Sequence, residues 1–140
     1  MTISKDTITG SIVAKNKRST VPAEIFGEVE WPLLVEPTIY QFAERLCQEY
    51  AGGYWIMHQL SNGGFLMYPD IESPVEVISP NGWSGQMSEV ELGIAACLFT
   101  YSHLSFGSGK VAEVCADQYH MIRDFLLQQP GYQAVWACID

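Results

Sequence analysis

The sequence predicts a single compact α+β domain in which a small antiparallel β-meander packs against several helices. Three observations lead to this fold class. The middle third alternates side-chain types between Asn-Gly turn signals, which is typical of β-hairpins. The last third repeats apolar residues at helical spacing. The chain has 140 residues, the usual size of one domain, and 48% of them are hydrophobic, which suffices for a core without disulfides or metal.

Residues 1–20 have the composition of a flexible polar N-terminal arm, and residues 21–140 form the expected domain. The arm shows no sustained period, although Ile8, Ile12 and Val13 favour a short strand within it. It holds four of the seven basic residues and one acidic residue. We expect this basic cluster to be solvated, and the alternative is contact with nucleic acid or an acidic partner surface. The cluster comprises Lys15, Lys17 and Arg18.

A proline-rich segment, residues 21–37, leads into the first predicted helix. Prolines alternate there with large apolar residues, which favours an irregular or extended segment packed on the core. A helix is predicted over Thr38–Ala51, because apolar residues recur at helical spacing. Thr38 and Gln41 resemble a capping box, and Gly52-Gly53 is expected to end the helix. The prolines are Pro22, Pro32 and Pro37.

The β-meander is predicted to follow this helix. Asn62 and Gly63 give the strongest hairpin signal, because both residue types accept the positive φ of a tight turn. Val75 and Val77 share one face of a later strand. The expected order is Tyr54–Leu60, a turn at Ser61–Gly64, Phe65–Tyr68, Pro74–Ser79, a turn at Pro80–Gly82, and a short fourth strand from Trp83.

The last third of the chain is predicted to be helical. Ser88 and Glu91 form a capping box that opens a helix reaching about Leu104. Its apolar residues lie on nearly every side, which indicates a buried central helix. The remaining elements are a loop at Phe106–Lys110, a helix over Val111–Gln128, and a terminal helix over Tyr132–Ile139.

The charge of the chain limits its partners. The formal net charge is −9, and residues 21–140 hold 15 acidic residues against three basic ones. Such a body repels phosphate backbones, so we expect no direct nucleic-acid binding by the acidic domain. The acidic residues are scattered among apolar ones, whereas a mimic of DNA needs a dense and regular array. Solubility is therefore the favoured explanation of the charge.

The four cysteines are expected to be reduced. Each lies within an apolar helical pattern, where free cysteine behaves as a small hydrophobic residue. The first 20 residues lack the apolar segment of a secretory signal, and no apolar run reaches the length of a membrane span. We therefore expect a cytoplasmic protein without membrane association. The cysteines are Cys47, Cys97, Cys115 and Cys138.

The sequence shows no catalytic, cofactor-binding or metal-binding constellation. The three histidines lack the spacing of a metal site, and no C-x-x-C motif is present. Phe106–Lys110 resembles a phosphate loop only faintly, because it follows a helix and lacks the first glycine and the final Ser or Thr. We therefore expect that the chain is not an enzyme. The alternative is a small hydrolase-like enzyme with Cys97 or Cys115 beside a histidine in a pocket.

Three ordered stretches, together covering about residues 18–140, carry a family resemblance. The first is Arg45–Trp55 with Leu60–Phe65 and Met67, the second is Asn81–Ser88 with Gly93-Ile94, and the third includes Tyr119-His120, Arg123–Phe125, Pro130 and Ile139-Asp140. In these stretches the sequence resembles the antirestriction protein family ArdB/KlcA. That family is carried on plasmids, mobile elements and pathogenicity islands.

The resemblance implies a protein that protects incoming plasmid or phage DNA from type I restriction-modification systems. It implies a compact α+β fold without a cofactor, and action by macromolecular contact and not by DNA mimicry. The expected partner is the type I restriction-modification complex or a host factor acting on it. The family has no agreed catalytic motif, so the resemblance assigns no catalytic residue. A DNA mimic remains a further alternative, which acidic residues in a duplex-like double row would support.

The expected interaction surface combines Arg18, Trp55 and Asp140. Arg18 is the only arginine of the arm and can make bidentate contacts that lysine cannot. Alternation places Tyr54 and Ile56 on the more apolar face of their strand and leaves Trp55 on the exposed face. Asp140 ends the sequence and has no evident folding role. The alternative is that Trp55 packs in the core, Arg18 pairs with a local acid, and Asp140 is merely solvated.

Overall fold

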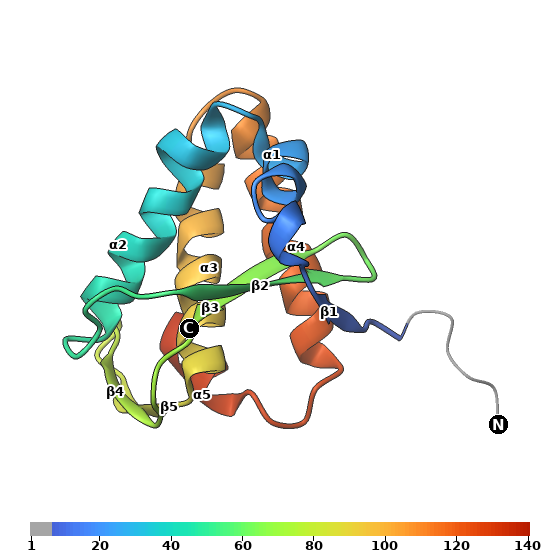
Figure 1. Cartoon of the computed structure of the whole chain (residues 1–140). Coiled ribbons are helices and arrows are strands. Elements are labelled where there is room, and N and C mark those ends of the chain that lie inside the picture. Colours follow the sequence, from blue (N-terminus) through green and yellow to red (C-terminus); the bar gives the residue numbers. More distant parts are fainter. Residues whose placement is uncertain (1–6) are drawn as a thin grey trace, which may run out of the picture.

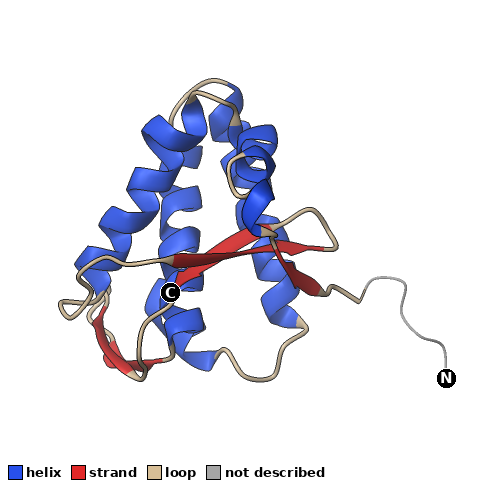
Figure 2. Cartoon of the chain, viewed as in Figure 1, coloured by secondary structure: helices blue, strands red, loops and turns tan. Residues whose placement is uncertain are grey.

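Residues 7–140, the part of the chain that the computed structural model describes, form five α-helices and five strands (Figure 1). The strands are β1 (Gly10–Ile12), β2 (Trp55–Leu60), β3 (Phe65–Pro69), β4 (Val75–Ile78) and β5 (Ser84–Met87). The helices are α1 (Thr20–Phe26), α2 (Glu36–Leu46), α3 (Glu89–Ser105), α4 (Lys110–Leu127) and α5 (Gln133–Ile139), with a 3-10 turn η1 (Lys15–Lys17) and a π-helical turn η2 (Trp31–Val35). The predicted α+β class is confirmed, since two small antiparallel sheets pack against helices (Figure 2).

The first sheet has the strand order β1-β2-β3 and is antiparallel throughout. Its β2–β3 hairpin turns at the predicted Asn-Gly signal, where Gly63 has a φ of 96° that glycine adopts without steric cost. The Asn62 side-chain oxygen accepts the Gly64 N–H at 3.0 Å, which fixes the turn. The short strand expected near the N-terminus is β1, whose Ser11 lies opposite Gln59 of β2.

The strands β4 and β5 form a second sheet, so the single expected meander is divided in two. Pro69 ends β3 and Pro74 directly precedes β4. Because proline has no N–H to donate to a ladder, the first sheet is not extended across this connection. The β4–β5 hairpin packs instead near α2, α3 and α5. Val75 and Val77 are buried on one face of it, as predicted.

The helix α3 is central in the fold and buried on nearly all sides, as its apolar sequence predicts. The predicted capping box is present, because the Ser88 hydroxyl accepts the Glu91 N–H and the Glu91 carboxylate accepts the Ser88 N–H. Gly93 allows a close approach to β3. A Cβ atom at this position would stand 2.3 Å from the Cβ of Tyr68 and 2.4 Å from the carbonyl oxygen of Met67. The helix therefore rests on the strand without room for a side chain.

The proline-rich segment is helical, which corrects the expectation of an irregular or extended segment. Pro22 stands in the first turn of α1, and Pro32 and Pro37 lie at the starts of η2 and α2. The N–H groups of a first turn have no partner within the helix, so proline is well tolerated there. Because Pro37 is tolerated in a first turn, α2 begins at Glu36, before Thr38. The Thr38 hydroxyl donates to the Leu34 carbonyl, so the expected capping box does not form.

The helix α2 also ends earlier than predicted. Its last residue is Leu46, and Cys47 is already extended with a φ of −131°. Gly52 and Gly53 have positive φ values of 92° and 125°, but they lie in the loop that leads to β2 and not at the helix end. This loop places Tyr50 next to the start of β2.

The first six residues of the expected arm lie outside the described residues. Beyond them, Ile8 and Val13 are buried in the main core, and the Val13 N–H donates to the Met57 carbonyl at 2.8 Å. This contact holds the chain on β2. The turn η1 follows and brings Arg18 beside the same strand.

An aromatic cluster joins the N-terminal helices to the main core. The ring centroid of Trp31 lies 5.4 Å from those of Phe26 and Phe65, and Tyr101 stacks on Phe26 at 5.6 Å. The Tyr101 hydroxyl donates to the Phe65 carbonyl at 2.7 Å. Because α1, η2, β3 and α3 all contribute to this cluster, the position of Trp31 is fixed from several sides.

Candidate interaction site

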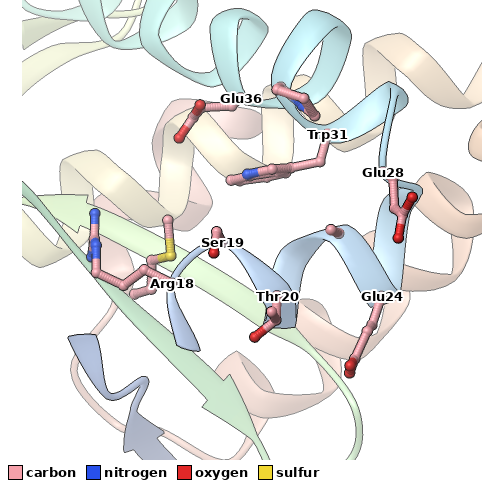
Figure 3. Close-up of a pocket in the computed structure, with 10 residues that line it drawn as sticks. Arg18, Ser19, Thr20, Glu24, Glu28, Trp31 and Glu36 are labelled. Carbon is pink, nitrogen blue, oxygen red and sulfur yellow. The ribbon is translucent and has the colours of Figure 1, made fainter. Parts of the chain in front are cut away.

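A groove of about 640 Å³ lies between α1 and the start of α2, above β2 (Figure 3). Its volume is in the range of small-molecule and peptide-side-chain pockets. The residues that determine its character come from α1, η2, α2 and β2 and from the turns on either side of α1. They are Arg18, Glu24, Glu28, Trp31, Glu36 and Met57.

The floor of the groove is apolar. Trp31 is 5% exposed and Met57 is 3% exposed, and both line the cavity. Within residues 7–140, the indole N–H of Trp31 makes no hydrogen bond. No fully buried side-chain polar atom of this part of the chain lacks a partner. The indole N–H is therefore open to the cavity, as its position in Figure 3 shows.

The rim of the groove is charged. Glu24 and Glu28 lie at the α1 end, whereas Arg18 lies at the opposite end beside β2, with Glu36 on the wall above (Figure 3). The groove thus holds three carboxylates and one guanidinium. Glu24 and Glu28 lie far from Arg18, whereas Glu36 lies at the same end as Arg18. The groove has an acidic end and a mixed end.

Arg18 is half-buried and held by two contacts at the mixed end. Its Nη1 donates to the Trp55 carbonyl at 2.6 Å. Its guanidinium carbon lies 4.5 Å from the centroid of the Tyr54 ring, in cation–π geometry. Tyr54 is 49% exposed. Arg18 and Tyr54, together called the Arg18–Tyr54 platform, thus present a guanidinium and an aromatic ring to solvent.

Trp55 is buried, so the prediction that its side chain is exposed is wrong. Its exposure is 2%, and its indole N–H donates to the Tyr50 hydroxyl at 2.9 Å. The edges of Tyr40 and Tyr50 pack on its ring, with centroids at 5.3 Å and 5.8 Å. Alternation alone counts apolar neighbours and cannot foresee that α2 and the following loop cover this face. The structure brings Trp55 and Arg18 together, but through the Trp55 carbonyl.

Tyr40 connects the groove wall to Trp55. The Tyr40 hydroxyl donates to the Glu36 carboxylate at 3.0 Å, and the Tyr40 ring contacts Trp55. Burial, and then the charge of Glu36, raise the pKa of Tyr40 well above its usual value. Tyr40 therefore remains a protonated donor at neutral pH and fixes the Glu36 side chain. Sequence reasoning nominated neither Tyr40 nor Glu36.

Asp140 lies at the end of α5, away from the groove-lining elements. The Asn81 side-chain amide donates to the Asp140 carbonyl at 3.1 Å and to the Ala137 carbonyl at 2.9 Å. The β4–β5 turn therefore anchors the C-terminal helix through its main chain. The Asp140 residue is exposed, and in the described part of the chain no contact joins it to Arg18 or Trp55.

The four cysteines are free and buried, as predicted. Burial raises the pKa of Cys97 to about 12 and that of Cys115 to about 11. A protonated, buried thiol is a poor nucleophile. Closed cysteine environments favour a binding protein over the Cys/His enzyme that the sequence left as an alternative.

On the face of β2 and β3 that points away from the groove, a hydrogen bond joins His58 and Tyr68. The His58 Nε2 lies 3.0 Å from the Tyr68 hydroxyl, and burial lowers the pKa of His58. Across residues 7–140 no group of three or more His, Cys, Asp or Glu side chains is placed to hold a metal ion. No helix in that range is both long and apolar enough to cross a membrane.

Sequence reasoning missed Trp31 and the acidic end of the groove, and it placed Tyr54 in the core. One signal was available for Trp31. Pro32 follows it directly, and proline near the first position marks the beginning of a helical turn. That interpretation places Glu28 in the turn before this helical segment and Glu36 directly after it.

Comparison with known proteins assigns the chain to a family. A family model described as antirestriction protein matches residues 48–140. The antirestriction protein KlcA of Escherichia coli is 33% identical over an alignment of 139 positions that covers 95% of each chain. The uncharacterized protein YfjX of Escherichia coli strain K12 is 36% identical over 118 residues, covering 82% of this chain and 76% of YfjX.

A solved structure matches the whole of both chains, with a TM-score of 0.88 and 32% sequence identity. It comes from a study of the KlcA and ArdB proteins, which show a novel fold and antirestriction activity against type I DNA restriction systems in vivo but not in vitro. The groove-lining segment from Arg18 to Glu36 precedes the family-model match, but this structure covers it. The family match spans more than half of the chain, and the two relatives cover 95% and 82% of it. The chain belongs to the antirestriction protein family.

Proposed function

We propose that this chain protects incoming plasmid or phage DNA from type I restriction-modification systems in the cell. The observation that carries the proposal is the likeness, over both entire chains, to a structure of proteins with that activity. A TM-score of 0.88 over the full length includes the groove as well as the core.

The chain acts by contact with a protein, and DNA mimicry is not its mechanism. The carboxylates of the groove stand beside an apolar floor and the Arg18–Tyr54 platform, an arrangement unlike the continuous acidic surface of a duplex. The KlcA and ArdB proteins act in vivo but not in vitro. That contrast favours a partner present only in the cell: the type I restriction-modification complex in its cellular state, or a host factor acting on it.

The contact surface is centred on the Arg18–Tyr54 platform. Trp55 contributes its carbonyl, which holds the guanidinium, while its buried side chain packs against Tyr40 and Tyr50. Asp140 is a second contact on a separate element, where its exposed side chain does not bind Asn81. The two contacts are independent in the fold and can be tested one at a time.

The test is the plating of unmodified phage on a type I restricting host. Expression of the chain should raise the plating efficiency markedly relative to an empty vector. Phage carrying the host modification, and a host without the restriction system, serve as controls and should plate equally with and without expression. Equal plating of unmodified phage, at confirmed levels of folded protein, contradicts the proposal.

We predict that all four cysteines are dispensable for protection. Their thiols are buried, so a Cys→Ala change costs packing and removes no chemistry. The measurement is plating efficiency alongside the melting temperature for each single variant. Loss of protection in Cys97→Ser or Cys115→Ser at an unchanged melting temperature would restore the Cys/His enzyme.

A further inference from the structure

The groove holds two kinds of polar group that lack a partner in the described residues. Glu24 and Glu28 are exposed at its acidic end, and no interaction within residues 7–140 engages their carboxylates. Trp31 is 5% exposed, yet its indole N–H faces the cavity without an acceptor. Because no fully buried polar atom of the described residues lacks a partner, this N–H reaches the solvent in the groove. A bound molecule with an acceptor can replace the water there.

We infer that the groove binds a basic, extended segment of a partner protein. One Arg or Lys side chain of the segment lies between Glu24 and Glu28, and a main-chain carbonyl of the segment accepts the indole N–H of Trp31. The inference deepens the proposed function and rests on it for the identity of the partner. The binding itself is measurable without any restriction system.

The chemistry of the groove selects a polypeptide over other cations. Carboxylates bind a cation, but an ammonium or guanidinium group offers no acceptor for the indole N–H. A peptide supplies a cationic side chain and a carbonyl oxygen in neighbouring positions. The apolar floor at Trp31 and Met57 suits the aliphatic stem of Lys or Arg. A polyamine lacks the carbonyl, and a nucleic acid is repelled by a chain of net charge −9.

Arg18 does not oppose a basic ligand, because it lies at the other end of the groove (Figure 3). Its charge is directed at the Trp55 carbonyl and the Tyr54 ring, and Glu36 stands on the wall of the same end. The groove is therefore polarised along its length. This polarity orients the segment, with its basic residue toward α1.

The probe is a capped hexapeptide of alternating alanine and arginine, titrated into the ¹⁵N-labelled full-length chain. The chain has four tryptophans, whose indole N–H signals provide internal controls. The Trp31 signal, assigned by its loss in Trp31→Phe, should shift with saturation. The signals of Trp83 and Trp136, which do not line the groove, should stay in place. The affinity should fall as the salt concentration rises, because the contact is ionic.

Charge variants sharpen the test. The double variant Glu24→Gln/Glu28→Gln, at exposed positions, should lower the affinity about tenfold or more, since it removes both charge-assisted contacts. The matched control Glu113→Gln/Asp117→Asn removes the same charge from exposed positions of α4. It should change the affinity by less than about twofold, because screened charges outside the groove contribute little.

Three results overturn the inference: no binding of the hexapeptide, binding that leaves the Trp31 signal unshifted, or equal affinity in the double glutamine variant. A fourth is an equal Trp31 shift with spermidine, which carries charge but no carbonyl. The two proposals also fail separately. Peptide binding by a chain that gives no protection contradicts the proposed function alone, and protection by a chain that does not bind the peptide contradicts this inference alone.

Discussion

The hairpin junction under α4 and the groove above β2 differ in whether the polar groups of their largely buried residues have partners within the chain. At the junction, Gln118 is 3% exposed, accepts the Phe65 N–H at 2.7 Å and donates to the Gly63 carbonyl at 3.1 Å. In the groove, Trp31 is almost equally buried, but its N–H has no acceptor among the described residues. A satisfied polar group specifies the fold, whereas an open one is available to a ligand.

This contrast separates two classes of variant. Changes in the closed region, formed by β3, α3, α4 and the hairpin, should lower stability and affect protection only by unfolding the domain. Changes at the exposed rim of the groove and at the Arg18–Tyr54 platform should affect protection and leave stability nearly unchanged. The free energy of unfolding of a variant therefore assigns the substituted residue to one of the two classes.

The largest effect is expected for Gly93→Ala. The added methyl group would meet the backbone of β3, with Met67 oxygen at 2.4 Å and Tyr68 Cα at 2.4 Å, and neither can move aside as a side chain does. We expect a loss of about 3 kcal/mol or more in the free energy of unfolding, measured by denaturant titration. Gly131→Ala is the matched control, because nothing lies near its Cβ position. Equal stability of the two variants would show that α3 does not rest on β3 as described.

Gln118→Leu should have the next largest effect. The substitution leaves the buried Phe65 N–H without an acceptor and removes the bond to the Gly63 carbonyl, at a cost of about 2 kcal/mol or more. Gln41→Leu, at an exposed position of α2, is the control and should be near neutral. A Gln118→Leu variant as stable as its control would mean that the junction is open to water, and the contrast with the groove would disappear.

Gly63→Val should cost about 1–3 kcal/mol, because a β-branched residue does not readily adopt a φ of 96°. Gly63→Asn serves as a graded control, since asparagine tolerates this region better than valine. A Cβ atom at this position meets only the flexible Met121 side chain, at 3.6 Å, so we expect backbone strain to dominate the effect. Equal melting temperatures for the Val and Asn variants would argue against strain at this turn.

The closed region is also the part that the sequence predicted best. Ser88 and Glu91 mark the start of α3 and Asn62-Gly63 marks the hairpin, because in both places short-range chemistry determines the backbone. The division into two sheets was not predictable in this way. Whether β4 continues one meander depends on where the chain packs after Pro74, which is a tertiary matter.

The groove was predicted poorly for the same physical reason. Arg18 was nominated and does line the groove, but Trp55 was assigned to the wrong face because Tyr40 and Tyr50, which cover it, come from other elements. Trp31 was hidden in a segment whose prolines suggested irregular structure. Local patterns identify the elements, whereas a groove is created by how elements from separate parts of the chain meet.

The smallest effect on stability is expected for Arg18→Glu, together with a large effect on function. Arg18 is half-buried, and its two contacts are a single hydrogen bond and a ring at the surface. An interaction of this kind contributes about 1 kcal/mol or less, so the melting temperature should fall only slightly. Protection of unmodified phage should nevertheless be lost, because the reversed charge removes the guanidinium from the platform. Lys110→Glu makes the same charge change at an exposed position of α4 and should protect as well as the parent. If Arg18→Glu unfolds the domain, Arg18 belongs with Gln118 as a structural polar group. If it stays folded and protects fully, the platform is not the contact surface. The division between a closed region for folding and an open groove for function is then wrong, and Asp140 is the remaining proposed contact.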